Sequence, residues 1–310
     1  MITSILCPVD RSAISRRALD YALALSRTYD AKLRVFEVVD TALPPLPHGS
    51  WPAVEVTADM RRAFLGELTR FTQRHRLPGI DPEIRIAEGQ VVPQILAEAG
   101  AMRADLVVMG THGRSGFERF ALGSVTEKVL RKCGRPVLAV PPGSRAPGRR
   151  GSFRTVVCAI DFSAPSRQAL KYARSLVPPG GRLSLVHAVA WPFGAGSAGP
   201  MPLEIERLRA TVCEAARKRL GTVARHIPDG VTVEAVVGLG KAAPEILRCA
   251  RDASADVIVM GLYGHTATRL ALLGSTTHRV IRDAPCPVLA VTKVPVPQPQ
   301  PRRGGVRADR

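Results

Sequence analysis

Several features are scarce or missing in this chain of 310 residues, and each absence argues against a class of protein. Aromatic residues make up only 5%, too few for the stacking surface of single-strand nucleic-acid binders. The six cysteines contain no CxxC pair, which argues against a disulfide framework and a clustered zinc site. No stretch approaches the roughly 20 apolar residues of a membrane span, and we find no signal peptide. We therefore expect no membrane association and a cytoplasmic location.

Negative charge is also scarce, since 44 Lys and Arg face 26 Asp and Glu, for a net charge of +18. The excess is spread over both halves, +7 in 1–150 and +11 in 151–310, without a long basic block. A basic surface attracts phosphate polymers. Because charge alone supports it, a polyanion partner is the third hypothesis, and nucleic acid is the weakest of the expected partners.

The chain contains an internal repeat, whose two copies are 151 residues apart. SILCPVDRSAISRRALDYALAL at 4–25 aligns with TVVCAIDFSAPSRQALKYARSL at 155–176, and ADLVVMG at 104–110 aligns with ADVIVMG at 255–261. An internal repeat indicates how many copies of one structural unit a chain contains, so we consider it before any motif. The alignment indicates a tandem duplication.

Each copy alternates apolar strands with helices. A helix follows the first strand, with Ser12 or Ser15 as its cap, and long charged helices are expected at about 55–76 and 203–226. This alternation predicts right-handed βαβ units. The expected fold is therefore α/β, with two tandem doubly wound parallel-sheet domains of strand order 3-2-1-4-5. The expected strands are 5–9, 33–39, 83–87, 106–109 and 137–140, then 156–160, 183–189, 231–237, 257–260 and 288–291.

Composition divides the chain into four parts. Residues 1–141 and 155–292 are the two expected domains, and 142–154 is a Pro-, Gly- and Arg-rich linker whose composition suits a flexible boundary. The tail 293–310 is basic and Pro-rich. We expect the tail to be disordered, because it cannot bury enough apolar surface.

A glycine frame with gaps of two and nine residues occurs in both copies, as GTHGRSGFERFALGS at 110–124 and GLYGHTATRLALLGS at 261–275. Each frame follows an apolar strand and precedes a helix whose N-terminal amides favour an anion. The hydroxyls of Ser124 and Thr126 are candidate phosphate donors. The frame is neither a Walker A loop nor a GxGxxG fingerprint. It predicts a phosphate cradle; the alternative is that these glycines serve only turns and caps.

Asp10 and Asp161 end the first strand of each copy. Such an aspartate can merely cap the following helix. In a sheet of order 3-2-1-4-5, however, strands one and four are neighbours and flank the topological switch point. We therefore expect Asp10 to face the same crevice as Gly110.

PVDRS, ADLVVMG and GTHGRSGFERFALGSVTEKVLRKCGRPVLAV resemble the universal stress proteins, and the G-2x-G-9x-G-S frame is similar to that of their ATP-binding members. The resemblance covers nearly the whole chain. It implies that Pro8 and Asp10 meet the ribose and that the backbone at Val38 meets the adenine. The residues implied around the phosphates are Met109, Gly110, Gly113, Gly123, Ser124 and Val125.

The second copy offers a corresponding set of residues. It departs from the pattern by placing Ala159 where the first has Pro8, and Leu262-Tyr263 where the first has Thr111-His112. It keeps the Gly, Ser and Asp frame. The implied residues are Ala159, Asp161, Ala188, Met260, Gly261, Gly264, Gly274, Ser275 and Thr276.

Two main functions remain open at this stage, besides the polyanion hypothesis. The first is an ATP-binding stress-response or regulatory module, which holds ATP with or without Mg²⁺. The second is a slow ATP hydrolase or a nucleotidyl or phosphoryl transferase, with Asp10 for metal and His112 or Arg114 for charge. No catalytic base is designated. The last strands can pair the two halves within one chain or two chains in a homodimer.

Overall fold

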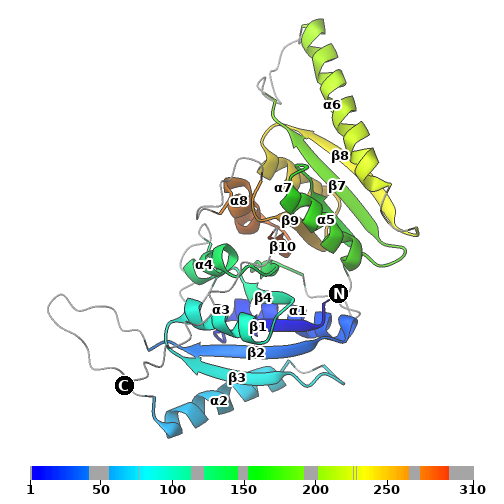
Figure 1. The fold of residues 1–310 in the computed structure, drawn as a ribbon. Coiled ribbons are helices and arrows are strands. Elements are labelled where there is room, and N and C mark those ends of the chain that lie inside the picture. Colours follow the sequence, from blue (N-terminus) through cyan, green and yellow to red (C-terminus); the bar gives the residue numbers. More distant parts are fainter. Residues whose placement is uncertain are drawn as a thin grey trace, which may run out of the picture.

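A computed structural model describes residues 2–41, 56–75, 77–112, 122–145, 153–191, 202–225, 227, 229–264 and 273–292. Both halves alternate strands and helices (Figure 1). The elements of the first half are β1 (Ser4–Pro8), α1 (Ala13–Tyr29), β2 (Lys32–Val39), α2 (Ala58–Gln73), β3 (Glu83–Glu88), α3 (Val91–Ala101), β4 (Leu106–Gly110), α4 (Ser124–Lys132) and β5 (Val137–Val140). Those of the second half are β6 (Thr155–Ala159), α5 (Ala164–Leu176), β7 (Arg182–Val189), α6 (Leu203–Ala224), β8 (Thr232–Leu239), α7 (Ala242–Asp252), β9 (Val257–Gly261), α8 (Ser275–Asp283) and β10 (Val288–Val291).

The strands form one ten-stranded sheet of order β3-β2-β1-β4-β5-β10-β9-β6-β7-β8. Each half alone has the order 3-2-1-4-5, and its strand pairs are parallel. This order confirms the doubly wound fold expected from the alternation. In both halves the strand that leads to the aspartate, β1 before Asp10 or β6 before Asp161, lies beside the strand that leads into the glycine frame.

Helices cover both faces of the sheet, and the strands supply side chains to each face in turn. Ile5 and Cys7 pack in the cluster under α1, α2, α5 and α6, whereas Leu6 packs in the cluster under α3, α4, α7 and α8. Val156, Cys158 and Val157 repeat this alternation in the second half. The strands are apolar throughout because both faces of a parallel sheet are buried.

The two halves meet through their last strands. β5 and β10 pair antiparallel, with Leu289 opposite Leu138. Of the two pairings open from the sequence, the structure contains the one within the chain; a homodimer stays a prediction.

The described ends of the expected linker pack against α1. The Tyr21 hydroxyl donates to the Arg145 carbonyl at 2.6 Å, and the Tyr21 ring stacks on Phe153 at 6.3 Å between centroids. Arg17 donates to the carbonyl of the buried Ser144 at 2.8 Å. The aromatic pair and the backbone acceptors thus hold the described linker ends on the helix, and the flexible boundary stays a prediction.

Most element boundaries differ from the expected ones by one to three residues. Ser12, rather than Ser15, caps α1, since its side chain accepts from the Ser15 amide at 3.2 Å. The long helix α2 begins at Ala58, after the cap Thr57, and ends at Gln73, so it is shorter than 55–76. Among the described residues, no helix is both long and apolar enough to cross a membrane. The tail 293–310 lies outside the described residues.

Candidate functional site

A cavity of about 350 Å³ lies at the carboxyl end of β1 and β4, where the sheet of the first half reverses its order. Open α/β sheets bind ligands at this edge. Seven of the predicted residues line it, while Val38 is not among the described lining residues and Gly113 lies outside the described residues. The lining residues are Pro8, Val9, Asp10, Ser15, Val91, Ile95, Met109, Gly110, His112, Gly123, Ser124, Val125 and Thr126.

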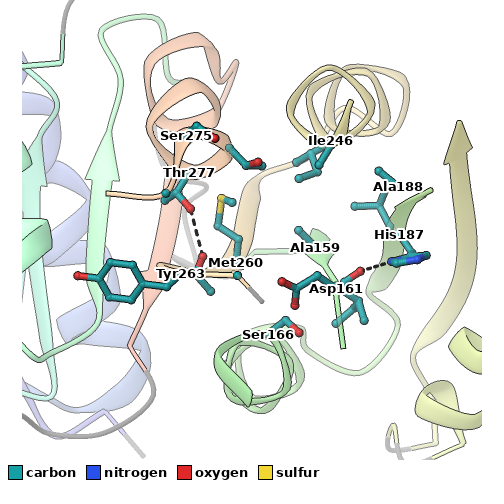
Figure 2. Close-up of a pocket in the computed structure, with 17 residues that line it drawn as sticks. Ala159, Asp161, Ser166, His187, Ala188, Ile246, Met260, Tyr263, Ser275 and Thr277 are labelled. Carbon is teal, nitrogen blue, oxygen red and sulfur yellow. Dashed lines mark hydrogen bonds between the residues drawn. The ribbon is translucent and has the colours of Figure 1, made fainter. Parts of the chain in front are cut away.

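The second half has the corresponding cavity, of about 160 Å³, and all nine predicted residues line it. Figure 2 shows Met260 and Ala159 on the floor, with Asp161 and Ser275 on opposite sides. The lining residues are Ala159, Ile160, Asp161, Ser166, Val186, His187, Ala188, Ala242, Ile246, Met260, Gly261, Tyr263, Gly264, Gly274, Ser275, Thr276 and Thr277.

The two aspartates have the same local geometry. Asp10 Oδ1 accepts from the Ser12 amide at 3.0 Å, and Asp161 Oδ1 accepts from the Ser163 amide at 2.9 Å. In each half the serine, not the aspartate, is the helix cap. The aspartates therefore brace the turn from strand to helix while their side chains border the cavities.

Several glycines of the frame are required by packing within the protein. A Cβ on Gly110 would lie 2.6 Å from Ile14 Cγ2, and one on Gly261 would lie 2.8 Å from Pro165 Cβ. A Cβ on Gly123 would lie 2.9 Å from the Thr111 carbonyl oxygen. These contacts are closer than real Cβ atoms tolerate, because the first helix of each half packs directly on the end of β4 or β9. At these positions the glycines are therefore needed for packing, as the alternative interpretation of the frame expected.

Gly264 differs from these glycines because its neighbour is a cavity residue. A Cβ there would lie 2.8 Å from Asp161 Oδ2. The second glycine of the frame thus lets the loop after β9 approach the carboxylate at the cavity mouth. Its first-half counterpart, Gly113, and the candidate cation Arg114 lie outside the described residues.

The hydroxyl of Thr126, a candidate phosphate donor, has a structural role instead. It donates to the Gly110 carbonyl oxygen at 2.8 Å in a buried position. Thr277 repeats this in the second half, with its Oγ1 3.3 Å from the Gly261 carbonyl oxygen (Figure 2) and 3.1 Å from the Leu262 carbonyl oxygen. These bonds tie the start of α4 and α8 to the strand ends, which fixes the helix N-termini at the cavity edge. Expecting Thr126 to bind phosphate was therefore wrong.

His112 contributes a polar atom to the first cavity. Its Nδ1 contacts Thr111 Oγ1 at 2.9 Å, and its Nε2 is buried without a hydrogen-bond partner among the described residues. Buried polar atoms are ordinarily satisfied, since an unmade bond costs about 1–3 kcal/mol. His112 Nε2 is therefore a group that a ligand or a water molecule could satisfy.

The rim beside each aspartate differs between the halves. In the first, Arg11 pairs with Glu37 at 2.9 Å and also with Glu67. In the second, Phe162 takes the place of Arg11, and Arg219 lies 3.9 Å from its ring centroid. Both residues have positive φ, 63° and 64°, as the turn requires.

His187 occupies the position that aligns with Glu37 of the first half. Like the next residue, Ala188, it lines the second cavity. Its Nδ1 is 2.7 Å from the Ile160 carbonyl oxygen (Figure 2), and its ring packs 4.8 Å from that of Phe162. Because a carbonyl oxygen only accepts, Nδ1 carries the proton in this contact. His187 did not appear among the sequence candidates, although Ala188 beside it did.

Other lining residues that the sequence reasoning missed come from the helix after the third strand. Val91 and Ile95 line the first cavity, and Ala242 and Ile246 line the second. The repeated pattern VVPQIL and AAPEIL, at the same shift of 151, was the signal that could have found them. These side chains supply the apolar wall that ligand pockets usually have.

The cysteines and metal-binding side chains add no chemistry within the part of the chain that the structure describes. Burial raises the pKa of Cys7 and of Cys158 far above the ordinary value, and both thiols are fully buried. They are not nucleophiles. No group of three or more His, Cys, Asp or Glu side chains that could hold a metal ion occurs among these residues.

Comparison with known proteins agrees with the repeat and the fold. The model of the universal stress protein family matches residues 1–141 and 152–292. Universal stress protein MJ0531 of Methanocaldococcus jannaschii is 32% identical over 139 residues, which cover 44% of this chain and 80% of that protein. Universal stress protein Rv1996 of Mycobacterium tuberculosis is 26% identical over 310 residues, covering 93% of this chain and 94% of that protein.

A solved structure has the same tandem arrangement over nearly its whole length. A universal stress protein from Archaeoglobus fulgidus matches with a TM-score of 0.65 and 25% identity, covering 94% of this chain and 98% of that one. The family model matches both halves of the repeat, and these relatives span the full chain. The chain therefore belongs to the universal stress protein family, as a member with two family domains in tandem.

Proposed function

We propose that this universal stress protein binds one nucleotide, ATP, in each half and acts as a nucleotide-dependent regulatory module of the stress response. The observation that carries the proposal is the recurrence of one arrangement in two cavities. In each, an aspartate, the glycine frame and the N-terminus of α4 or α8 border the same crevice. A helix N-terminus favours an anion, and glycine permits close approach of the backbone.

The residues fit a nucleotide in both their polar and their apolar parts. Ser124 and Ser275 open the two helices beside the cavity, and backbone amides of a first turn have no intrahelical acceptor. The apolar floor at Met109 or Met260 suits a base and ribose. In the first half His112 Nε2, which has no hydrogen-bond partner among the described residues, adds a polar group that a ligand can satisfy.

Magnesium enters this proposal with the nucleotide. Mg²⁺ is usually held by one or two carboxylates together with phosphates and water. Asp10 in the first cavity and Asp161 in the second are the carboxylates placed to supply one ligand each. The ion's chemistry would be to neutralise phosphate charge.

The test is to place a negative charge where the phosphates are proposed to lie. Ser124→Glu and Ser275→Glu each add a carboxylate at the first position of a helix, where acidic residues stabilise the helix. Like charges in a site cost several kcal/mol, which corresponds to a loss of affinity of about a hundredfold. Calorimetry on verified apo protein should give two ATP per wild-type chain, one per single variant and none for the double variant.

Matched controls separate charge from shape. Ser124→Ala and Ser275→Ala should retain two ATP per chain, and circular dichroism should show that all variants fold. Unchanged stoichiometry in the folded double Glu variant would remove the phosphate-cradle proposal. Mass spectrometry of the ligand released on denaturation identifies any nucleotide that copurifies, and a flavin or oligonucleotide instead of ATP would contradict it.

A further inference from the structure

The second half contains a large side compartment that opens from its candidate nucleotide site. This compartment measures about 740 Å³ and shares Ala188, Ala242, Ser275 and Thr276 with the smaller cavity beside Asp161. Ligand cavities usually measure about 300–1,000 Å³, so the cavity of 160 Å³ beside Asp161 is small on its own. A ligand of this half therefore has room to extend into the side compartment.

Two cations, an indole and the carboxylate of Glu245 line the side compartment, and Glu245 is paired with Arg248 at 2.7 Å. Lys241 precedes α7, and Arg279 lies on α8 one turn after Ser275. Arg279 lines the compartment with its side chain 51% exposed, and its Nε lies 3.9 Å from Asp283 Oδ2. Trp191 follows β7 and is partly buried at the wall. Cations next to an aromatic ring are suited to a phosphate joined to a second ring.

The matched positions of the first half have the opposite charge. The strand pairs Val39–Glu88 and Val189–Leu239 align the two halves at this edge. At five aligned positions the first half has Asp40, Glu88, Gln90, Gln94 and Lys128, and the second has Ala190, Leu239, Lys241, Glu245 and Arg279. The formal charge changes from −1 to +1. Thr41 in the first half aligns with Trp191 in the second.

We propose that the second half is selective for a dinucleotide, meaning a nucleotide with a second base attached through its phosphates. The first nucleoside would lie beside Asp161, and the second base and adjoining phosphate would lie in the side compartment against Trp191, Lys241 and Arg279. This rests on the proposed nucleotide function. The first half, with acidic residues at the aligned positions, would take the mononucleotide.

The experiment uses the full chain carrying Ser124→Glu, so that only the second site binds. The probes are ATP, diadenosine tetraphosphate and adenosine 5′-tetraphosphate, which has the same phosphate chain without the second base. Stacking of a base on an aromatic side chain contributes about 1–3 kcal/mol, and a charge-assisted bond contributes about as much. Diadenosine tetraphosphate should therefore bind at least about tenfold more tightly than either other probe.

Two substitutions replace a residue of the second half by the residue at the aligned position of the first half. Lys241→Gln and Trp191→Thr should each remove most of the tenfold advantage while changing ATP affinity less than about twofold. Lys128→Gln, on the first-half helix, is the matched control and should change nothing. The chain has two tryptophans, Trp51 and Trp191, so in a Trp51→Phe background dinucleotide binding should quench the remaining fluorescence.

The outcomes separate this inference from the proposed function. Equal affinity for ATP and the dinucleotide, or an advantage that survives both substitutions in folded protein, overturns dinucleotide selectivity and leaves ATP binding in place. Equal affinity for the two tetraphosphates overturns the second-base assignment, since charge alone would explain it. Absence of any nucleotide binding to the wild-type chain overturns the proposed function as well.

Discussion

The two halves keep the same backbone turn beside their aspartates but support it with different chemistry. Arg11 in the first half is held by Glu37 and Glu67, whereas Phe162 in the second packs on His187 and lies against Arg219. An ion-pair cluster has thus been exchanged for an aromatic and cation–π cluster at the same place in the fold.

This exchange shows which parts of the duplicated unit are constrained. The turn residue has a φ of 63° in one half and 64° in the other, and each aspartate accepts from the serine two residues later. The backbone path is shared, while the side chains around it changed polarity. The rim side chains therefore differ between the halves without a change in the backbone turn, and the following predictions test how far the halves are equivalent.

The largest loss of stability is expected from substitutions of Leu220 and Leu68, which anchor the two long outer helices α6 and α2. α6 spans 22 residues, and its buried side chains are Ala216 and Leu220; α2 is anchored by Leu68. Leu220→Ala and Leu68→Ala should each lower the free energy of unfolding by about 3 kcal/mol, because they leave a cavity. Urea unfolding measures this.

Hydrogen exchange should show α6 losing more protection than α2, since two of its 22 residues are buried against two of 16 in α2. Leu208→Ala is the control, because Leu208 is 51% exposed on the same helix, and it should change stability by less than about 0.5 kcal/mol. A loss below 1 kcal/mol for Leu220→Ala would show that α6 is held by other contacts.

The glycines that end β4 and β9 should respond unequally to a methyl group. At Gly261 a Cβ would meet Pro165 Cβ at 2.8 Å and backbone atoms at 3.0 Å, whereas at Gly110 the nearest atom, at 2.6 Å, is the Ile14 side-chain carbon Cγ2. Gly261→Ala should cost about 2 kcal/mol and Gly110→Ala about half as much, because Ile14 can change rotamer. Gly221→Ala, with open space around it, should be neutral or stabilising. Equal costs in thermal unfolding would contradict the packing difference.

A pH effect is expected from Asp105, which directly precedes β4. Burial would raise the pKa of Asp105, but hydrogen bonds from Thr3 and Ser4 lower it overall. A lowered folded-state pKa adds stability above the unfolded pKa, and this stability is lost as the pH falls through the folded value. Asp105→Asn should therefore lower stability at neutral pH and flatten the acid limb of the stability curve. At the matched position of the second half, Asp256 accepts from the Thr155 amide at 2.8 Å.

The smallest effect concerns a contact between the halves. The Tyr263 hydroxyl donates to the Arg131 carbonyl oxygen at 3.4 Å, and Figure 2 shows its ring directed away from the cavity toward the first half. Tyr263→Phe removes this long bond and should cost no more than about 0.5 kcal/mol. His112 is the matched position in the other half. A loss of several degrees in melting temperature would mean that Tyr263 is a main support of the junction.

Much of this protein followed from the sequence alone. The shift of 151 residues revealed the duplication, apolar runs with alternating helices predicted the strand order, and the positions of Asp10 and Asp161 after the first strands predicted where the cavities lie. These features are local or repeated. Backbone periodicity and turn geometry depend on neighbouring residues, so a pattern in the sequence is sufficient to indicate them.

Other features were decided only by the tertiary structure. Gly110 and Gly261 serve helix packing because Ile14 and Pro165 fill the space beside them, and Thr126 turns its hydroxyl to a strand carbonyl. The antiparallel pairing of β5 with β10 and the gathering of cations beside the second cavity bring together residues distant in the chain. No local period encodes such contacts, since they depend on how whole helices and sheets pack against one another.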